Sequence, residues 1–269
     1  MPAAARGPAV APALVCPERP ISVAFYEFGA LYRAAGGERA GGFDGTGIDV
    51  DLMRELKRRS GCRFEGTTMT RARIWWELEG GRLDMTTSGI ATPEREKLFA
   101  FAPYILLKHN VWMLASHPPV PGGLAEFMAN PRLRWGAVRG YRHTPDYDAA
   151  LDEARAQGRV VEATEDAALL RLLAEGSVDA VIAHAVVIRG YAAQHPRKPQ
   201  LVALDWAPRG SVVPEGLVLS RTRFSEAEIA AWRRLVWEVV RDGTLARIAR
   251  RHVPEDEVAE LIPRDDLSR

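Results

Sequence analysis

No stretch of this 269-residue sequence approaches the roughly 18 consecutive apolar residues that a membrane-spanning helix needs. An excess of charge is also missing, because 36 lysines and arginines nearly balance 35 aspartates and glutamates. Such a chain has no overall field that favours nucleic acid or an anionic membrane, so any preference for charge must be local. We therefore expect no membrane span and no nucleic-acid partner.

Cysteine is scarce: Cys16 and Cys62 are the only two, which excludes a disulfide-rich scaffold. Neither has partners at metal-ligand spacing, so we expect no metal site and no other cofactor. Each cysteine precedes a predicted strand, the first starting near Ile21 and the second near Arg63. If these strands are parallel neighbours, both thiols lie at the same end of the sheet, and a disulfide is as consistent with the sequence as two unpaired thiols.

The familiar signatures of hydrolysis are absent as well. There is no nucleophile elbow around a serine, no helical zinc motif of paired histidines and no phosphate-binding loop. These absences disfavour a hydrolase, and we expect no catalytic residues and no enzyme activity.

Residues 1–19 lack the basic cluster followed by an unbroken apolar run that marks a secretory signal. A trimmed export signal, a misplaced start and a protein that stays inside the cell all fit this observation. We expect these residues to form a mostly flexible lead-in.

Two similar series of elements follow the lead-in. Residues 21–25, 64–69 and 83–87 read as strands, and residues 48–59 and 74–79 between them have apolar residues at helical spacing. The same order recurs later, with strands at 134–138, 160–163 and 178–183 and helices at 145–157 and 165–175. Two βαβαβ series predict two α/β lobes, each with a parallel sheet.

Extended segments at residues 112–117 and 211–220 separate these series, and strong helices at 225–242 and 244–252 follow. The chain is thus expected to leave the first lobe, build the second and return, with a hinge at the two crossovers. We place lobe one at residues 20–114 plus 217–269 and lobe two at residues 115–216.

Several motifs resemble the amino-acid-type, family 3 group of bacterial extracellular solute-binding proteins that serve ABC importers. They are GTGIDVDL at residues 45–52, SGIATPER at 88–95, FAFAPY at 99–104, RWGAVRG at 134–140 and DGTLARIA at 242–249. The resemblance covers roughly residues 20–253. It implies a two-lobed, type II periplasmic-binding-protein-like fold, a periplasmic location, an ABC permease as partner, a small carboxylate ligand and a monomeric protein.

The resemblance also implies the ligand residues of lobe one. The family's anchor is an arginine after a Thr-Pro-Glu turn, which here is Arg95, because a guanidinium can hold a carboxylate through two parallel hydrogen bonds. This turn is one residue shorter than the family's, and Ala102 replaces its usual serine. The further candidates are Ser88, Gly89 and Thr92 in the turn, Arg73 at a helix start, where a solvated side chain is the alternative, and Tyr26 and Phe28 after the first strand, where core packing is the alternative.

On lobe two the expected ligand residues are Gly140, Tyr141 and Arg142, in a turn whose backbone amides can meet an anion. His184 stands where the family's amino-acid binders carry an aspartate for the ligand's ammonium group. The hypothesis is therefore a carboxylate ligand that either lacks a free α-amino group or has its amine met elsewhere, for instance by Glu27 or Asp166.

Two other functions share this fold. Cyclohexadienyl dehydratases belong to it, and His184 or His143 could supply the proton donor that their chemistry needs. A sensor module that reports ligand binding to a signalling partner is the other alternative.

Overall fold

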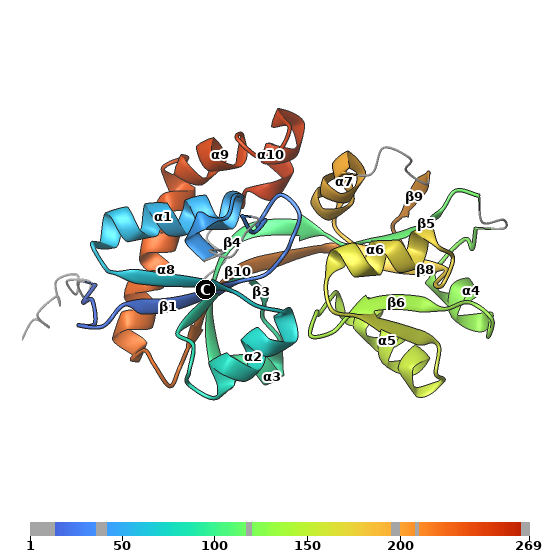
Figure 1. Ribbon diagram of the computed structural model, residues 1–269, viewed down its shortest axis with the longest axis horizontal. Helices are drawn as coiled ribbons and strands as arrows, with labels where there is room; N and C mark the ends of the chain where they lie inside the picture. The colour runs from blue at the N-terminus through green and yellow to red at the C-terminus, as the bar shows by residue number, and fades with distance from the viewer. Residues whose placement is uncertain (1–13, 36–41, 117–119, 195–199, 208–209, 265–269) are drawn as a thin grey trace, which may run out of the picture.

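The computed structural model describes residues 14–35, 42–116, 120–194, 200–207 and 210–264, which form two five-stranded sheets side by side (Figure 1). The first sheet has the order β2-β1-β3-β10-β4 and the second the order β7-β6-β8-β5-β9. In each, three neighbouring strands are parallel and two further pairings are antiparallel. The predicted α/β fold with two βαβ-built lobes is confirmed.

The first sheet, which defines lobe one, consists of β1 (Ile21–Phe25), β2 (Phe64–Thr68), β3 (Met85–Ile90), β4 (Phe99–Lys108) and β10 (Val212–Ser220). The second sheet, which defines lobe two, consists of β5 (Asn110–Leu114), β6 (Trp135–Val138), β7 (Val160–Ala163), β8 (Ala180–Ala183) and β9 (Leu201–Leu204).

Helices cover both faces of each sheet (Figure 1). Those of lobe one are the short 3-10 helix η1 (Gly42–Asp44), α1 (Ile48–Ser60), α2 (Arg71–Glu79), α3 (Pro93–Glu96), α8 (Glu226–Arg241), α9 (Thr244–Ala249) and α10 (Glu255–Leu261). Those of lobe two are α4 (Leu124–Ala129), α5 (Pro145–Ala156), α6 (Asp166–Ala174) and α7 (Ala185–Gln194).

Local sequence accounts for the two longest helices of lobe one. Helix α1 buries the apolar stripe that includes Leu52 and Leu56 and ends at Gly61, whose φ of 72° suits a residue without a side chain. Helix α8 begins with a capping box, in which the backbone N–H of Glu228 donates to the Ser225 hydroxyl and the Ser225 N–H donates back to the Glu228 carboxylate. Both helices pack their apolar faces on the first sheet.

Other elements differ from the sequence prediction. Helix α2 begins at Arg71 rather than at residue 74, and β3 begins at Met85 rather than at residue 83. Strands β4 and β9 and helix α7 were not predicted.

The two crossovers lie earlier in the chain than expected. A single residue, His109, separates β4 in the first sheet from β5 in the second, and β10 pairs in the first sheet from Val212 onward. The His109 N–H donates to the Ser211 carbonyl at 2.7 Å, so the crossovers are hydrogen-bonded to each other. The strands thus change sheets near residues 109 and 211, before the expected boundaries at 114 and 216.

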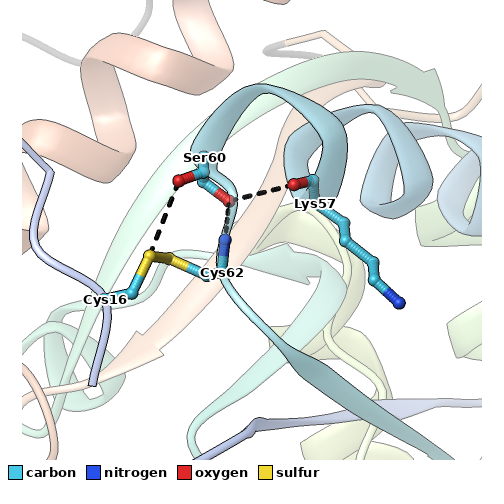
Figure 2. The surroundings of a disulfide bond; sticks show 4 residues. All are labelled: Cys16, Lys57, Ser60 and Cys62. Carbon is cyan, nitrogen blue, oxygen red and sulfur yellow. Dashed lines mark hydrogen bonds between the residues drawn. A yellow bond between two sulfur atoms is a disulfide. The ribbon is translucent and has the colours of Figure 1, made fainter. Parts of the chain in front are cut away.

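A disulfide joins Cys16 to Cys62, which decides between the two alternatives left open by the sequence (Figure 2). The Cys16 sulfur also lies 3.5 Å from the Ser60 carbonyl oxygen, a contact without a hydrogen bond because a disulfide sulfur carries no proton. Within the lead-in that was expected to be flexible, residues 16–19 are therefore attached to lobe one, while residues 1–13 lie outside the described residues.

Arg19 strengthens this attachment. Its guanidinium donates to both carboxylate oxygens of the buried Asp84, at 2.6 and 2.7 Å, and Arg223 donates to the same carboxylate at 2.8 Å. No helix in the described part of the chain is long and apolar enough to cross a membrane.

Candidate ligand site between the lobes

Three cavities lie along the boundary between the lobes, and each is lined by residues of both. The arginine cavity, about 460 Å³, has Trp75, Thr92 and Arg95 from lobe one and Gly140, Tyr141 and Arg142 from lobe two among its lining residues. The tyrosine cavity, about 240 Å³, includes Tyr26, Met69, Arg71, Tyr141 and Glu165. The acidic cavity, about 310 Å³, includes Glu27, Arg33, Glu165, Asp166 and Tyr191.

A larger open depression of about 850 Å³ lies elsewhere, between α1 and α9 on lobe one. Most of its charged side chains pair with each other, as in the ion pair between Arg59 and Asp242 at 2.7 Å. Because it lies on one lobe only, is open to solvent and has most of its charges paired, we do not assign it as the ligand site.

Arg95 links the two lobes. Thr92 caps the short helix α3 by accepting the Arg95 N–H at 3.3 Å, and the guanidinium donates to the carbonyls of Ile90 at 3.0 Å and of Gly140 at 2.9 Å. Its central carbon lies 3.8 Å from the centre of the Trp75 ring. Burial, and then the positive charges of Arg71 and Arg142, lower the pKa of Arg95 to about 9.

Arg71, the first residue of α2, is the more deeply buried of the two arginines at this boundary. It is 4% exposed, donates to the Thr87 and Ser88 carbonyls at 3.3 and 2.9 Å, and lies 4.2 Å from the centre of the Tyr26 ring. Within the described ranges no carboxylate pairs with Arg71 or Arg95. Both charges are thus held by neutral carbonyls and aromatic rings beside the cavities.

Arg73, for which the sequence left a ligand role and a solvated side chain open, lines none of the three cavities. Its side chain is 65% exposed and pairs with Glu77 one helical turn away. Because α2 begins at residue 71, Arg73 points to solvent, and Arg71 takes the place beside Tyr26. Thr70 ends the loop after β2 at the sheet's carboxyl edge and is the N-cap of α2. A threonine at this position could have indicated that the helix begins at Arg71.

Ser88 and Gly89 do not line any of the three cavities. Ser88 has a φ of 49°, and its hydroxyl donates to Asp49 at 2.8 Å while its N–H donates to the Tyr104 hydroxyl at 3.1 Å. A side chain at Gly89 would meet Val218 on β10 at 2.2 Å. These residues face the core of lobe one.

Hydrogen bonds in the core of lobe one hold Arg71 and Tyr26 in place beside the cavities. The Ser88 carbonyl accepts hydrogen bonds from Arg71 and from the Tyr26 hydroxyl, the latter at 3.0 Å. Asp49 is fully buried and also accepts the Tyr104 hydroxyl at 2.6 Å. Its burial outweighs these donors and raises the pKa of Asp49 to about 6.

An aromatic cluster closes the boundary between the lobes. Tyr26 and Phe28 of lobe one meet Tyr141 of lobe two edge-on, with ring centres 5.7 and 5.9 Å apart. Tyr26 and Tyr141 line the tyrosine cavity, whereas Phe28 is buried against both rings and against His184. The predicted aromatic residues are thus brought together, with Phe28 as a packing residue behind the other two.

Acidic side chains gather at the far side of Tyr141. Its hydroxyl lies 3.2 Å from a carboxylate oxygen of Asp166, and burial raises the pKa of Asp166 to about 7. Glu27 accepts the Ala34 N–H at 2.8 Å, and burial raises its pKa as well. Since Glu27 and Glu165 line both the acidic and the tyrosine cavities, positively charged and negatively charged walls meet in one region.

The lobe-two turn presents a carbonyl to lobe one. The Gly140 carbonyl accepts from Arg95 and from the Trp75 indole, and Gly140 has a φ of 86° close to the Ala72 backbone. The Tyr141 N–H already donates to Val138, so it does not point at an anion as predicted. Arg142 does line the arginine cavity.

His184 lies outside the three cavities and faces the crossovers. It is 5% exposed, its Nδ1 atom lies 3.1 Å from the Lys108 carbonyl, and its ring meets that of His109 at 4.3 Å. Burial lowers the pKa of His184 to about 4 and that of His143 to about 3, so both rings are neutral. Neither histidine is placed to transfer a proton to a ligand in the cavities.

Comparison with known proteins agrees with this architecture. The sequence matches the bacterial extracellular solute-binding proteins, family 3, over residues 39–255. No curated protein sequence matches it.

Solved structures of similar fold cover most of the chain. EhuB in complex with hydroxyectoine has a TM-score of 0.72 and 18% identity, covering 89% of this chain and 90% of that one. The arginine-, lysine-, histidine-binding protein ArtJ from Geobacillus stearothermophilus has a TM-score of 0.68 and 20% identity, covering 89% and 98%. A histidine kinase sensor domain has a TM-score of 0.71 and 18% identity, covering 87% and 96%.

Proposed function

Because this chain belongs to the bacterial extracellular solute-binding proteins of family 3, we propose that it is a monomeric periplasmic binding component of an ABC importer. Its ligand is a small metabolite with a carboxylate group. A solute-binding role follows from the family itself, whereas the importer, the location and the ligand class are the proposal. The disulfide supports the location, because such bonds persist in oxidising compartments.

Two guanidiniums without a carboxylate partner, Arg71 buried and Arg95 half-buried, carry the proposal for the ligand. A buried charge without a counterion is costly, and main-chain carbonyls compensate only part of that cost. Arg71 and Arg95 both contact Trp75 and border neighbouring cavities, so a carboxylate between them would receive charge-assisted hydrogen bonds from two directions. Thr92 and Arg142 add polar groups on the same side.

The acidic cavity favours one of the two ligand types left open by the sequence. Glu27, Glu165 and Asp166 lie across Tyr141 from the arginines and offer partners for an ammonium group. We therefore propose a ligand whose amine is met by this acidic wall, with His184 taking no part. The cavities, at about 240 to 460 Å³, suit a molecule of amino-acid size.

Binding is coupled to movement of the lobes. The Arg95 and Trp75 bonds to Gly140, and the contacts between Tyr26, Phe28 and Tyr141, all join one lobe to the other. Bending near residues 109 and 211 would break these contacts and open the cavities to solvent, and a ligand held by both lobes would favour the closed form. The permease would then recognise closure.

Calorimetry with matched pairs of ligands tests this function. Each pair consists of an L-amino acid and its deaminated counterpart, and the protein is compared with a Glu27→Gln variant. We expect the amino acid of at least one pair to bind more tightly than its counterpart, and the variant to reduce that difference. Binding of the amine-free acids alone would contradict the role of the acidic wall.

The alternatives have less support. A dehydratase would need a proton donor beside the ligand, and the two histidines considered for that role lie away from the cavities. Incubation with prephenate or arogenate tests it directly. A histidine kinase sensor domain has a similar structure, so the fold does not separate a sensor from a transport protein. Neighbouring genes for a permease and an ATPase would support transport, whereas a gene for a signalling protein would support a sensor.

A further inference from the structure

Four buried side chains meet where the chain crosses between the lobes, away from the three cavities. His109 joins β4 to β5 and is completely buried, and Glu215 on the crossover strand β10 is 2% exposed. His184 follows β8 of lobe two, and His143 follows the turn after β6. These residues come from four separate segments, which is why no spacing motif indicated a metal in the sequence.

Two polar atoms at the centre of this cluster have no hydrogen-bond partner among the described residues: Nε2 of His109 and Oε1 of Glu215. They are 3.8 Å apart, and Nε2 of His184 lies 3.4 Å from the same Glu215 oxygen. Both distances exceed the usual 2.7–3.2 Å range of a hydrogen bond. Buried polar atoms in this state need another partner.

The strand geometry directs Glu215 to this place. In the pairing of β10 with β4, Glu215 faces Ile105 and Gly216 faces Pro103, so the pairing skips Tyr104. Such an irregularity turns a side chain away from the direction that regular alternation would give it.

The surrounding hydrogen bonds leave lone pairs on the facing atoms. Because the Lys108 carbonyl can only accept, Nδ1 of His184 carries that ring's proton and Nε2 has a lone pair. Nδ1 of His109 lies 3.0 Å from Nδ1 of His143, and a proton on the His109 atom leaves Nε2 of His109 with a lone pair as well. Imidazole ligands of metal ions characteristically donate their second N–H in this way.

We propose that His109, His184 and Glu215 bind a divalent transition-metal ion of the zinc type at the crossovers. The three ligand atoms all lie within 4.8 Å of one another. Zinc ligands at about 2.0–2.2 Å in tetrahedral geometry are separated by about 3.4 Å. The Glu215 oxygen lies 3.4 Å from Nε2 of His184 and 3.8 Å from Nε2 of His109, close to that value. Two imidazoles and one carboxylate leave a fourth position for water.

The location gives this site a consequence for hinge bending. His109 and Glu215 belong to the two crossovers, and His184 belongs to lobe two, so a bound ion would hold the three segments in one arrangement. This proposal does not depend on the ligand proposed above, because the cluster lines none of the three cavities.

Equilibrium dialysis of the full chain, stripped of metal with a chelator, tests the proposal with Zn²⁺ and with Mg²⁺ as the comparison. The amount of bound metal is measured by elemental mass spectrometry. We expect Zn²⁺ to saturate at one ion per chain and Mg²⁺ not to bind, because imidazole ligands suit zinc and not magnesium. Absence of Zn²⁺ binding would overturn the proposal.

Variants distinguish the cluster from a histidine elsewhere in the chain. We expect His109→Gln, His184→Gln and Glu215→Gln to weaken Zn²⁺ binding by more than the roughly 10–100-fold loss expected for His143→Phe, which removes only the supporting acceptor. The control is His252→Gln, because His252 hydrogen-bonds Asp51 within lobe one, is not part of the cluster and should not affect binding. Equal affinities in all variants would place the ion elsewhere and reject the site.

X-ray absorption of the zinc-loaded wild-type protein provides a readout that needs no variant to fold. The expected first shell contains two imidazole nitrogens and oxygen at about 2.0–2.2 Å. A shell without two imidazoles would contradict the assignment.

Discussion

Removal of the disulfide between Cys16 and Cys62 should lower the stability of lobe one and leave ligand binding intact. The bridge closes a loop with a sequence separation of 46 residues that contains β1, η1 and α1. Alanine is the suitable replacement at both positions, because Cys62 is 2% exposed and a buried serine hydroxyl would add a cost of its own.

The expected loss follows from the loop length. The chain-entropy relation gives about 4 kcal/mol at 25 °C for a loop of this size. For a chain of this length, 1 kcal/mol corresponds to a change in Tm of about 2–4 °C, so Tm should fall by roughly 8–16 °C.

Differential scanning calorimetry of the wild type and of the Cys16→Ala/Cys62→Ala variant measures this shift. A strong reductant should lower the Tm of the wild type toward that of the variant and leave the variant itself unchanged. Ligand affinity should be the same in both proteins, because the bridge precedes β1 and β2 whereas Tyr26 and Thr70 follow them.

Two results would refute this reasoning. One is a variant that melts within about 1 °C of a wild type whose thiols cannot be alkylated, since the loop would then contribute nothing. The other is a wild type, secreted into an oxidising compartment, that retains two alkylatable thiols.

Three further predictions concern charge and backbone. Burial alone would raise the pKa of Asp84, but its arginine partners and Ser22 hold that pKa below its usual range, so this contribution to stability is present above about pH 4 and is lost as pH falls. Asp84→Asn should therefore destabilise the protein by about 2 kcal/mol at pH 7 and flatten its acid unfolding curve, measured by circular dichroism. The pKa of Asp49 shifts in the opposite direction, because its value of about 6 in the folded protein exceeds that in the unfolded chain. Stability should therefore decrease as pH rises from 4 to 6, and the decrease should be smaller in Asp49→Asn. Gly140→Ala should weaken ligand binding and expand the protein in small-angle scattering, since the added carbon would lie 3.1 Å from lobe one, whereas Gly158→Ala, with a φ of 68° and open space around it, should affect stability only.

The elements with a strong local signal were predicted correctly from the sequence. Helices α1 and α8 have regular apolar stripes together with a glycine stop or a capping box, and these features act within a few residues of each other. Residues 99–114 lacked such a signal, because β4 and β5 form an almost continuous extended run and only pairing decides that the sheet changes at His109.

The candidate ligand residues show the same division. Arg95 was a candidate because it matches the arginine that follows the Thr-Pro-Glu turn in the family it resembles, and the structure puts it at the boundary between the lobes. Ser88 was expected in the cleft, but its positive φ turns the side chain toward Asp49, which no alternation pattern reveals. Arg71 was missed because the choice between it and Arg73 depends on where α2 begins.

The affinity of arginine variants for a ligand identified by mass spectrometry of the purified protein tests the central claim most directly. Calorimetry should show that Arg95→Met and Arg71→Met each weaken binding by about 10–100-fold, as expected for the loss of charge-assisted hydrogen bonds of about 1.5–3 kcal/mol. Arg73→Met, a matched change on the exposed side of the same helix, should bind like the wild type. Equal affinities in all three variants would contradict the account.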